Sequence, residues 1–90
     1  MKLIIAILQD TIAQEAIRRL GQAKHPVTKL SSTGGFMKSG NTTILTGVAD
    51  EIVDDVVAIL KETVSERESE EKNVAMANIF VLPMEEYRKM

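Results

Sequence analysis

Two short segments of this chain are apolar at consecutive positions, so any strand that they form has two apolar faces. Residues Leu3–Leu8 read Leu-Ile-Ile-Ala-Ile-Leu, and residues Ile79–Leu82 read Ile-Phe-Val-Leu. Because side chains alternate between the faces of a strand, helices that cover one face leave an apolar surface on the other. A bare surface of this kind is unfavourable in water. We therefore predict that further subunits cover the second face and that the protein is a cyclic oligomer.

The order of the predicted elements favours a ferredoxin-like α+β fold. Strands are predicted at Lys2–Gln9, Val27–Thr33, Asn41–Val48 and Val74–Leu82, and helices at Thr11–Leu20 and Asp50–Val64. Ser65–Asn73 is predicted to be a charged connector, with a fraying end of the second helix as the alternative. With right-handed crossovers, this order gives a four-stranded antiparallel sheet with both helices on one face. Another small α+β sandwich is the alternative. The 90 residues are expected to form a single domain, 1–90.

Local signals predict where the helices begin and end. Residues Thr11–Gln14 fit a capping box, in which the Thr hydroxyl and the Gln side chain satisfy free backbone donors. Gly21 is a natural residue for the end of the first helix. Asp50 is predicted to cap the second helix, because its carboxylate can accept hydrogen bonds from the first turn.

Charge is distributed unevenly along the chain. The stretch from Ala16 to Ala49 contains five basic residues and no acid, whereas Asp50–Lys72 contains nine acids and three basic residues. The net charge of −2 argues against DNA or RNA as a partner. The basic stretch permits a local anion site. The alternative is that the two stretches are solvated faces of opposite sign.

No residue pattern predicts catalysis, a metal site or a cofactor. There is no Cys, and the only histidine, His25, has no second ligand or carboxylate near it in sequence. Met37 stands where a phosphate-binding loop needs a Gly before its Lys. The first residues are too short and too weakly basic for a secretion signal, and no apolar run could span a bilayer. We therefore expect a cytoplasmic protein that is not bound to membranes.

The segment from Thr28 to Thr43 is the predicted binding region. It is rich in hydroxyl side chains and contains three glycines, two lysines and no acid. Glycines allow backbone N–H groups to turn toward an anion, and Lys29 adds positive charge. Phe36 would be a stacking platform for a base or would insert into a neighbouring subunit. The alternatives are that Gly34-Gly35 simply turns a hairpin and that Phe36 belongs to the core.

These residues resemble those of the PII-like cyclic di-AMP receptor family. The resemblance is carried by Met1–Asp10, Thr28-Lys29-Leu30, Thr33-Gly34-Gly35-Phe36, Gly40-Asn41-Thr42-Thr43, Gly47-Val48 and Phe80-Val81-Leu82-Pro83. It implies a ferredoxin-like homotrimer that binds a nucleotide between subunits, relays the signal to a partner protein and has no enzymatic activity. The candidate ligand-binding residues are Thr28, Lys29, Gly35, Phe36, Met37, Asn41 and Gly47. In this interpretation Thr28 and Asn41 make polar contacts, while Phe36 and Met37 bound an adenine.

Two departures from the family pattern leave the identity of the ligand open. Pro26 stands where family members usually have an Arg, and Ser65–Asn73 is short where they have a long Gly/Pro-rich insertion. One interpretation is that Lys24, His25 or Lys29 replaces the missing positive charge. The alternatives are that the site is degenerate and that it is tuned to another small anion.

Two other functions are compatible with the same fold. One is a trimeric protein-interaction module that binds no small molecule. The other is an acylphosphatase, which shares the strand order but needs a phosphate loop containing Gly and Arg after the first strand. Residues Gln9–Ala13 contain neither.

Overall fold

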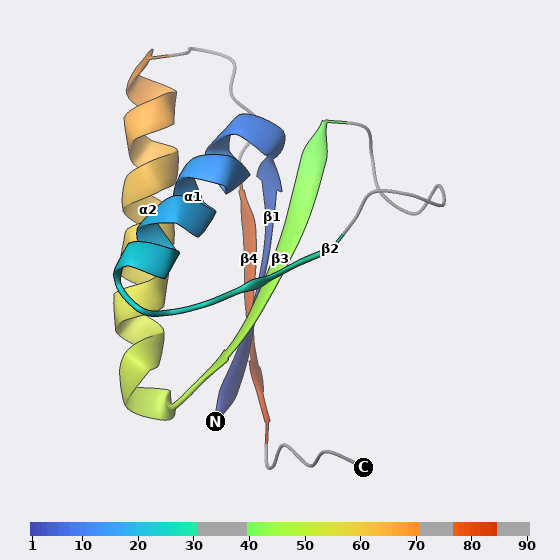
Figure 1. Cartoon of the computed structure of the whole chain (residues 1–90), viewed down its shortest axis with the longest axis vertical. Coiled ribbons are helices and arrows are strands. Elements are labelled where there is room, and N and C mark those ends of the chain that lie inside the picture. The colour runs from blue at the N-terminus through green and yellow to red at the C-terminus, as the bar shows by residue number, and fades with distance from the viewer. Residues whose placement is uncertain (31–39, 71–76, 85–90) are drawn as a thin grey trace.

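The computed structural model describes residues 1–30, 40–70 and 77–84, and contains an antiparallel sheet with two helices on one face (Figure 1). In chain order the elements are β1 (Lys2–Gln9), α1 (Asp10–Gln22), β2 (Thr28–Leu30), β3 (Asn41–Val48), the single 3-10 turn η1 (Asp50–Ile52), α2 (Val53–Glu70) and β4 (Asn78–Pro83). The strand order is β2-β3-β1-β4. The predicted ferredoxin-like fold is therefore confirmed.

The core lies between the helices and the facing side of the central strands. In β1, the side chains of Ile4, Ala6 and Leu8 are each about 1% exposed. They alternate with half-buried neighbours, as expected for a strand whose faces have different surroundings. The buried apolar residues are Ile4, Ala6, Leu8, Ile12, Ala13, Ala16, Leu20, Ile44, Val48, Val56 and Leu60.

The first and third strands have the predicted bounds, whereas β2 and β4 differ from prediction. The structure places β2 at Thr28–Leu30, and residues 31–33 of the predicted strand lie outside the described residues. It places β4 at Asn78–Pro83, and residues 74–76 of that prediction also lie outside. The helix α2 continues to Glu70, so much of the predicted connector is helical.

The helix α1 begins at Asp10, and the predicted capping box is wrong. Its N-cap residue is Gln9, which makes no side-chain capping hydrogen bond. Instead, the Asp10 carboxylate accepts a hydrogen bond from the Thr42 hydroxyl at 2.6 Å, and the Asp10 N–H donates to the Gly40 carbonyl at 2.9 Å. These contacts tie the start of α1 to β3, and an acidic residue there is also favoured by the helix dipole.

The end of α1 was also predicted wrongly, because the residue that reverses the chain is Lys24 and not Gly21. The His25 N–H donates to the Leu20 carbonyl at 2.8 Å, and the Lys24 N–H donates to the Gly21 carbonyl at 3.0 Å. This pair of bonds is the Schellman motif, whose left-handed residue is usually glycine. Here that residue is Lys24, with φ 65°.

Removing the glycine at position 21 and placing one at position 24 are therefore each expected to stabilise the fold. Gly21→Ala should raise the free energy of unfolding by about 0.5–1 kcal/mol, because Gly21 is helical and a Cβ there meets nothing within 4 Å. Lys24→Gly should raise it by about 1 kcal/mol, because glycine adopts positive φ without strain. Urea unfolding measures both. A destabilised Gly21→Ala variant would mean that Gly21 does end the helix.

The prediction that Asp50 caps the second helix is wrong as well. The turn η1, which leads directly into α2, has Ala49 at its N-cap position, and no side-chain capping bond forms there. The Asp50 carboxylate instead lies 3.1 Å from the amino group of Met1, and the hydrogen bond from this group lowers the pKa of Asp50. Within the described residues, neither helix is long and apolar enough to span a bilayer.

Candidate functional site

The sheet face opposite the helices is apolar across its three longest strands. The register places Leu45 of β3, Ile5 of β1 and Phe80 of β4 side by side on this face, because directly paired residues share a face. Phe80 is 48% exposed and Leu82 is 45% exposed. We call this surface the open face; its apolar members are Leu3, Ile5, Ile7, Leu45, Phe80 and Leu82. A single chain therefore has the uncovered second face that its sequence predicts.

A pocket lies at one end of the open face, where β2 runs beside β3. Its volume is about 430 Å³. We call it the β2–β3 pocket. It is lined by Met1, Leu3, Pro26, Thr28, Leu45, Thr46, Gly47 and Met84. Thr28 pairs with Leu45, which places it close to Gly47 on neighbouring strands. The structure thus brings together two of the predicted site residues, Thr28 and Gly47.

Gly47 keeps this pocket open because two methionine side chains converge on it. A Cβ at position 47 would lie 3.2 Å from the Met84 terminal methyl and 3.8 Å from that of Met1. The Met84 N–H donates to the Met1 carbonyl at 2.9 Å, which holds the two backbones together. Any side chain at position 47 would therefore take up space inside the pocket.

The remaining wall is formed by the chain segment before β2. The Thr46 hydroxyl donates to the Pro26 carbonyl at 3.1 Å, and Thr46 is buried. This bond fastens Pro26 to β3 at the edge of the pocket. Pro26 is the residue that stands where the resembled family usually has an Arg, so this wall has an uncharged side chain at that point.

The other predicted site residues are not gathered here. Lys29 pairs with the core residue Ile44 and so faces the helix side, where it lines a separate hollow of about 360 Å³ beside α1. Asn41 lies on the same face of the sheet as Gly47, but six residues of extended strand separate the two by about 20 Å. Gly35, Phe36 and Met37 lie outside the described residues.

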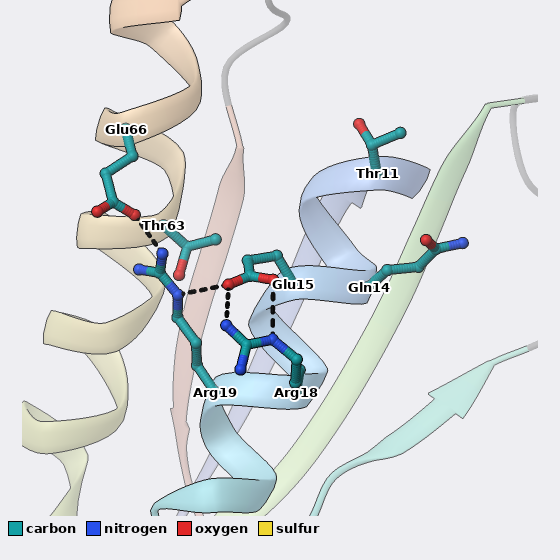
Figure 2. Close-up of a pocket in the computed structure, with 7 residues that line it drawn as sticks. All are labelled: Thr11, Gln14, Glu15, Arg18, Arg19, Thr63 and Glu66. Carbon is teal, nitrogen blue, oxygen red and sulfur yellow. Dashed lines mark hydrogen bonds and ion pairs between the residues drawn. The ribbon is translucent and has the colours of Figure 1, made fainter.

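A third hollow, of about 470 Å³, lies between α1 and α2 and was not predicted (Figure 2). The Glu15 carboxylate accepts hydrogen bonds from the Arg18 Nε at 3.0 Å and the Arg19 Nε at 2.9 Å, and Arg19 also pairs with Glu66. The bonds from Arg18 and Arg19 lower the pKa of Glu15 from about 4.5 to about 2. Two of the five cations in the basic stretch are thus engaged by carboxylates. The sequence contains a signal for this cluster, because residues three and four positions apart on a helix are neighbours, and Glu15 precedes Arg18 and Arg19 by these distances.

The Glu15 cluster predicts a specific pH dependence of stability. Since the pKa of Glu15 is lower in the folded chain, the ionised carboxylate stabilises the fold fully above about pH 4.5, and this stabilisation is lost as the pH falls toward about 2. Glu15→Gln should therefore be less stable than the parent at pH 7 and equally stable near pH 2. The effect should be small and weakened by salt, because the Glu15 side chain is one-third exposed.

Urea unfolding between pH 7 and pH 2 measures this difference. Glu62→Gln is the matched control, because it removes the same charge from an exposed position of α2 outside the cluster. A Glu15→Gln effect that is constant over the whole pH range would contradict the assignment.

Comparison with known proteins identifies a family and a similar solved structure. A family model described as cyclic-di-AMP receptor matches residues 1–72. Among solved structures, a functionally unknown protein from Pediococcus pentosaceus is 31% identical, with a TM-score of 0.76 over 99% of this chain and 96% of that chain. The family match spans β1, β2 and β3, and thus includes every residue of the β2–β3 pocket except Met84.

Proposed function

Because this chain belongs to the cyclic-di-AMP receptor family, we propose that it is a homotrimeric cytoplasmic signal receptor that binds a nucleotide at subunit interfaces and relays the bound state to a partner protein. The observation that carries the proposal is the β2–β3 pocket, where Thr28 and Gly47 lie together on the open face. The ligand is proposed to be cyclic di-AMP or a related anion, and to be bound without being turned over.

The open face supports the proposal that the receptor is an assembly. Side chains such as Ile5, Leu45 and Phe80 form a continuous apolar surface that the helices cannot cover, because both helices lie on the other side of the sheet (Figure 1). Burying such a surface stabilises an assembly by about 25 cal/mol per Å². The resemblance to the PII-like family supplies the number of subunits, three.

The positions of the predicted contacts support a site that is shared between subunits. Thr28 and Gly47 line the β2–β3 pocket, whereas Asn41 lies about 20 Å from Gly47 at the far end of β3. One nucleotide base cannot touch both ends of this strand. If Asn41 contributes to the same ligand, a neighbouring copy has to bring it to the pocket.

The segment between β2 and β3 carries the proposed relay. It contains Gly35, Phe36 and Met37, which the family resemblance assigns to the ligand. This segment lies outside the described residues, and we propose that ligand contact with it changes the surface offered to a partner.

Calorimetry with cyclic di-AMP and with linear adenine nucleotides tests the proposed function. The parent protein is expected to bind at least one of them more tightly than millimolar. Phe36→Ala and Asn41→Ala should each weaken binding about tenfold, the loss of about 1.4 kcal/mol, without changing the mass of the assembly. Gln22→Ala is the matched control, because Gln22 is an exposed amide at the end of α1, on the helix side of the sheet. A parent protein that binds none of these nucleotides would refute the receptor function.

A further inference from the structure

We infer that Asp10 is a positioning residue of the proposed nucleotide site, because it holds the chain on both sides of Asn41. Its carboxylate and its backbone N–H contact β3 at two points, an arrangement that we call the Asp10 clamp. This inference rests on the proposed function, in which Asn41 contacts the ligand, and adds to it a residue that acts through Asn41.

The two contacts of the Asp10 clamp lie on either side of Asn41 along the chain. The Thr42 hydroxyl donates to the Asp10 Oδ1 at 2.6 Å, a length typical of a hydroxyl bound to a carboxylate. The Asp10 N–H donates to the Gly40 carbonyl at 2.9 Å. Since Gly40 and Thr42 are the neighbours of Asn41, the backbone before and after Asn41 is fixed relative to the start of α1.

The start of β3 depends on this hold because few strand contacts support it. In the described part of the chain, β2 pairs with β3 from Thr43 to Leu45, so Asn41 and Thr42 have a strand partner on one side only. That partner is the end of β1, which has no pairing with β4 beyond Ile7. A two-stranded end of a sheet opens more readily than its centre.

The start of α1 is a firm anchor for the Asp10 clamp. The core residues Ile12, Ala13 and Ala16 of this helix are at most 1% exposed, and the start of α1 lies at the same end of the sheet as the start of β3 (Figure 1). Thr42 lies on the helix side of β3, so the alternation of side chains places Asn41 on the open face. The clamp therefore holds β3 from one face and leaves the Asn41 side chain accessible on the other.

Loss of the Asp10 carboxylate would disturb the strand at this point. Thr42 is only 7% exposed, and its hydroxyl is paired with Asp10. A nearly buried hydroxyl that loses its hydrogen bond is unfavourable, and the end of β3 can relieve this by moving toward water. Such a movement would displace Asn41, the next residue along the strand.

Calorimetry with cyclic di-AMP and with linear adenine nucleotides tests the inference in variants of the Asp10 clamp. Asp10→Ala and Thr42→Val should each weaken binding about tenfold. The double variant should bind no more weakly than either single variant, because both changes remove the same hydrogen bond. Asp10→Asn and Thr42→Ser should bind within about threefold of the parent, because an amide oxygen can accept this bond and a serine hydroxyl can donate it.

Two further measurements distinguish positioning from a general structural role. In an Asn41→Ala background, Asp10→Ala should weaken binding less than about twofold further, because the side chain that it positions has been removed. In the ligand-free protein, the hydrogen-bonded amides within residues 41–43 should exchange their hydrogens at least about tenfold faster in Asp10→Ala than in the parent, whereas those within residues 44–46 should not change.

Asp54→Ala and Thr63→Val are the matched controls, and both should bind like the parent. Asp54, like Asp10, is an exposed carboxylate in the first turn of a helix. Thr63, like Thr42, is a buried threonine with a bonded hydroxyl, but it donates within its own helix, α2.

Three results would overturn the inference while the receptor function stands. They are parent-like affinity in Asp10→Ala, unchanged exchange within residues 41–43, and a further tenfold loss on adding Asp10→Ala to Asn41→Ala. A parent protein that binds none of the nucleotides would instead refute the receptor function itself.

Discussion

Replacing Ile5 by lysine is expected to convert an assembly of about 30 kDa, three times the chain mass of 9.9 kDa, into a 9.9 kDa monomer. Ile5 lies at the centre of the open face, paired with Leu45 on one side and Phe80 on the other. In the proposed trimer its side chain is buried between subunits, so an ammonium there would be desolvated without a partner, at a cost of several kcal/mol in each copy.

The variant is expected to keep its fold as a single chain. In an isolated subunit the open face meets water, so a lysine at position 5 can extend its charge into solvent. The core residues that hold β1 to the helices, such as Ile4 and Ala6, point to the other side of the sheet. Light scattering gives the mass, and circular dichroism verifies the secondary structure.

Ala58→Lys is the matched control for added charge. Ala58 is exposed on α2, away from the open face, so this variant should retain the mass of the parent. An Ile5→Lys variant that keeps the full mass would contradict the assignment of the open face to the subunit interface.

Gly47→Leu is expected to weaken nucleotide binding at least about 100-fold, which corresponds to about 2.7 kcal/mol. The new side chain would project into the β2–β3 pocket, where even a Cβ comes within 3.2 Å of the Met84 methyl. The end of a methionine side chain can move at little cost, so the fold should tolerate the change. Strands also gain from losing a glycine, so the free energy of unfolding should not fall.

Two further glycine variants test whether Gly47→Leu weakens binding by filling the pocket or only because a glycine has been replaced. Gly47→Ala should weaken binding less than Gly47→Leu, because Met84 needs to move by only a few tenths of an ångström. Gly21→Ala, in α1, should leave binding unchanged. Calorimetry at equal protein concentrations compares the three. Parent-like affinity in Gly47→Leu would show that the nucleotide binds elsewhere.

The elements that could be predicted from the sequence are those set by local hydrophobic pattern. The bounds of β1 and β3 match the prediction, because each is a run of aliphatic or β-branched residues that ends at polar ones. The topology followed from the order of such runs. The predicted ends of the first helix were wrong for two reasons. A tertiary contact decides its start, because Asp10 is held by Thr42 from β3. At its other end, a lysine occupies a left-handed backbone position where a glycine is usual.

The candidate site was predicted only in part, for reasons of geometry. Thr28 and Gly47 were both named, and they lie together. Lys29 was named with them, yet the alternation of side chains along β2 sends it to the helix side, which a period of two already implied. Met1 and Met84 were missed, because only the pairing of β1 with β4 brings these distant residues to one pocket.

Sedimentation velocity of the parent protein at micromolar concentration tests the central claim most directly, because the proposed interface sites require the open face to be covered. We expect a single species of about 30 kDa, three times the chain mass. A stable species of 9.9 kDa at that concentration would contradict the account, since Ile5 and Phe80 would then face water and the β2–β3 pocket would have no neighbouring subunit.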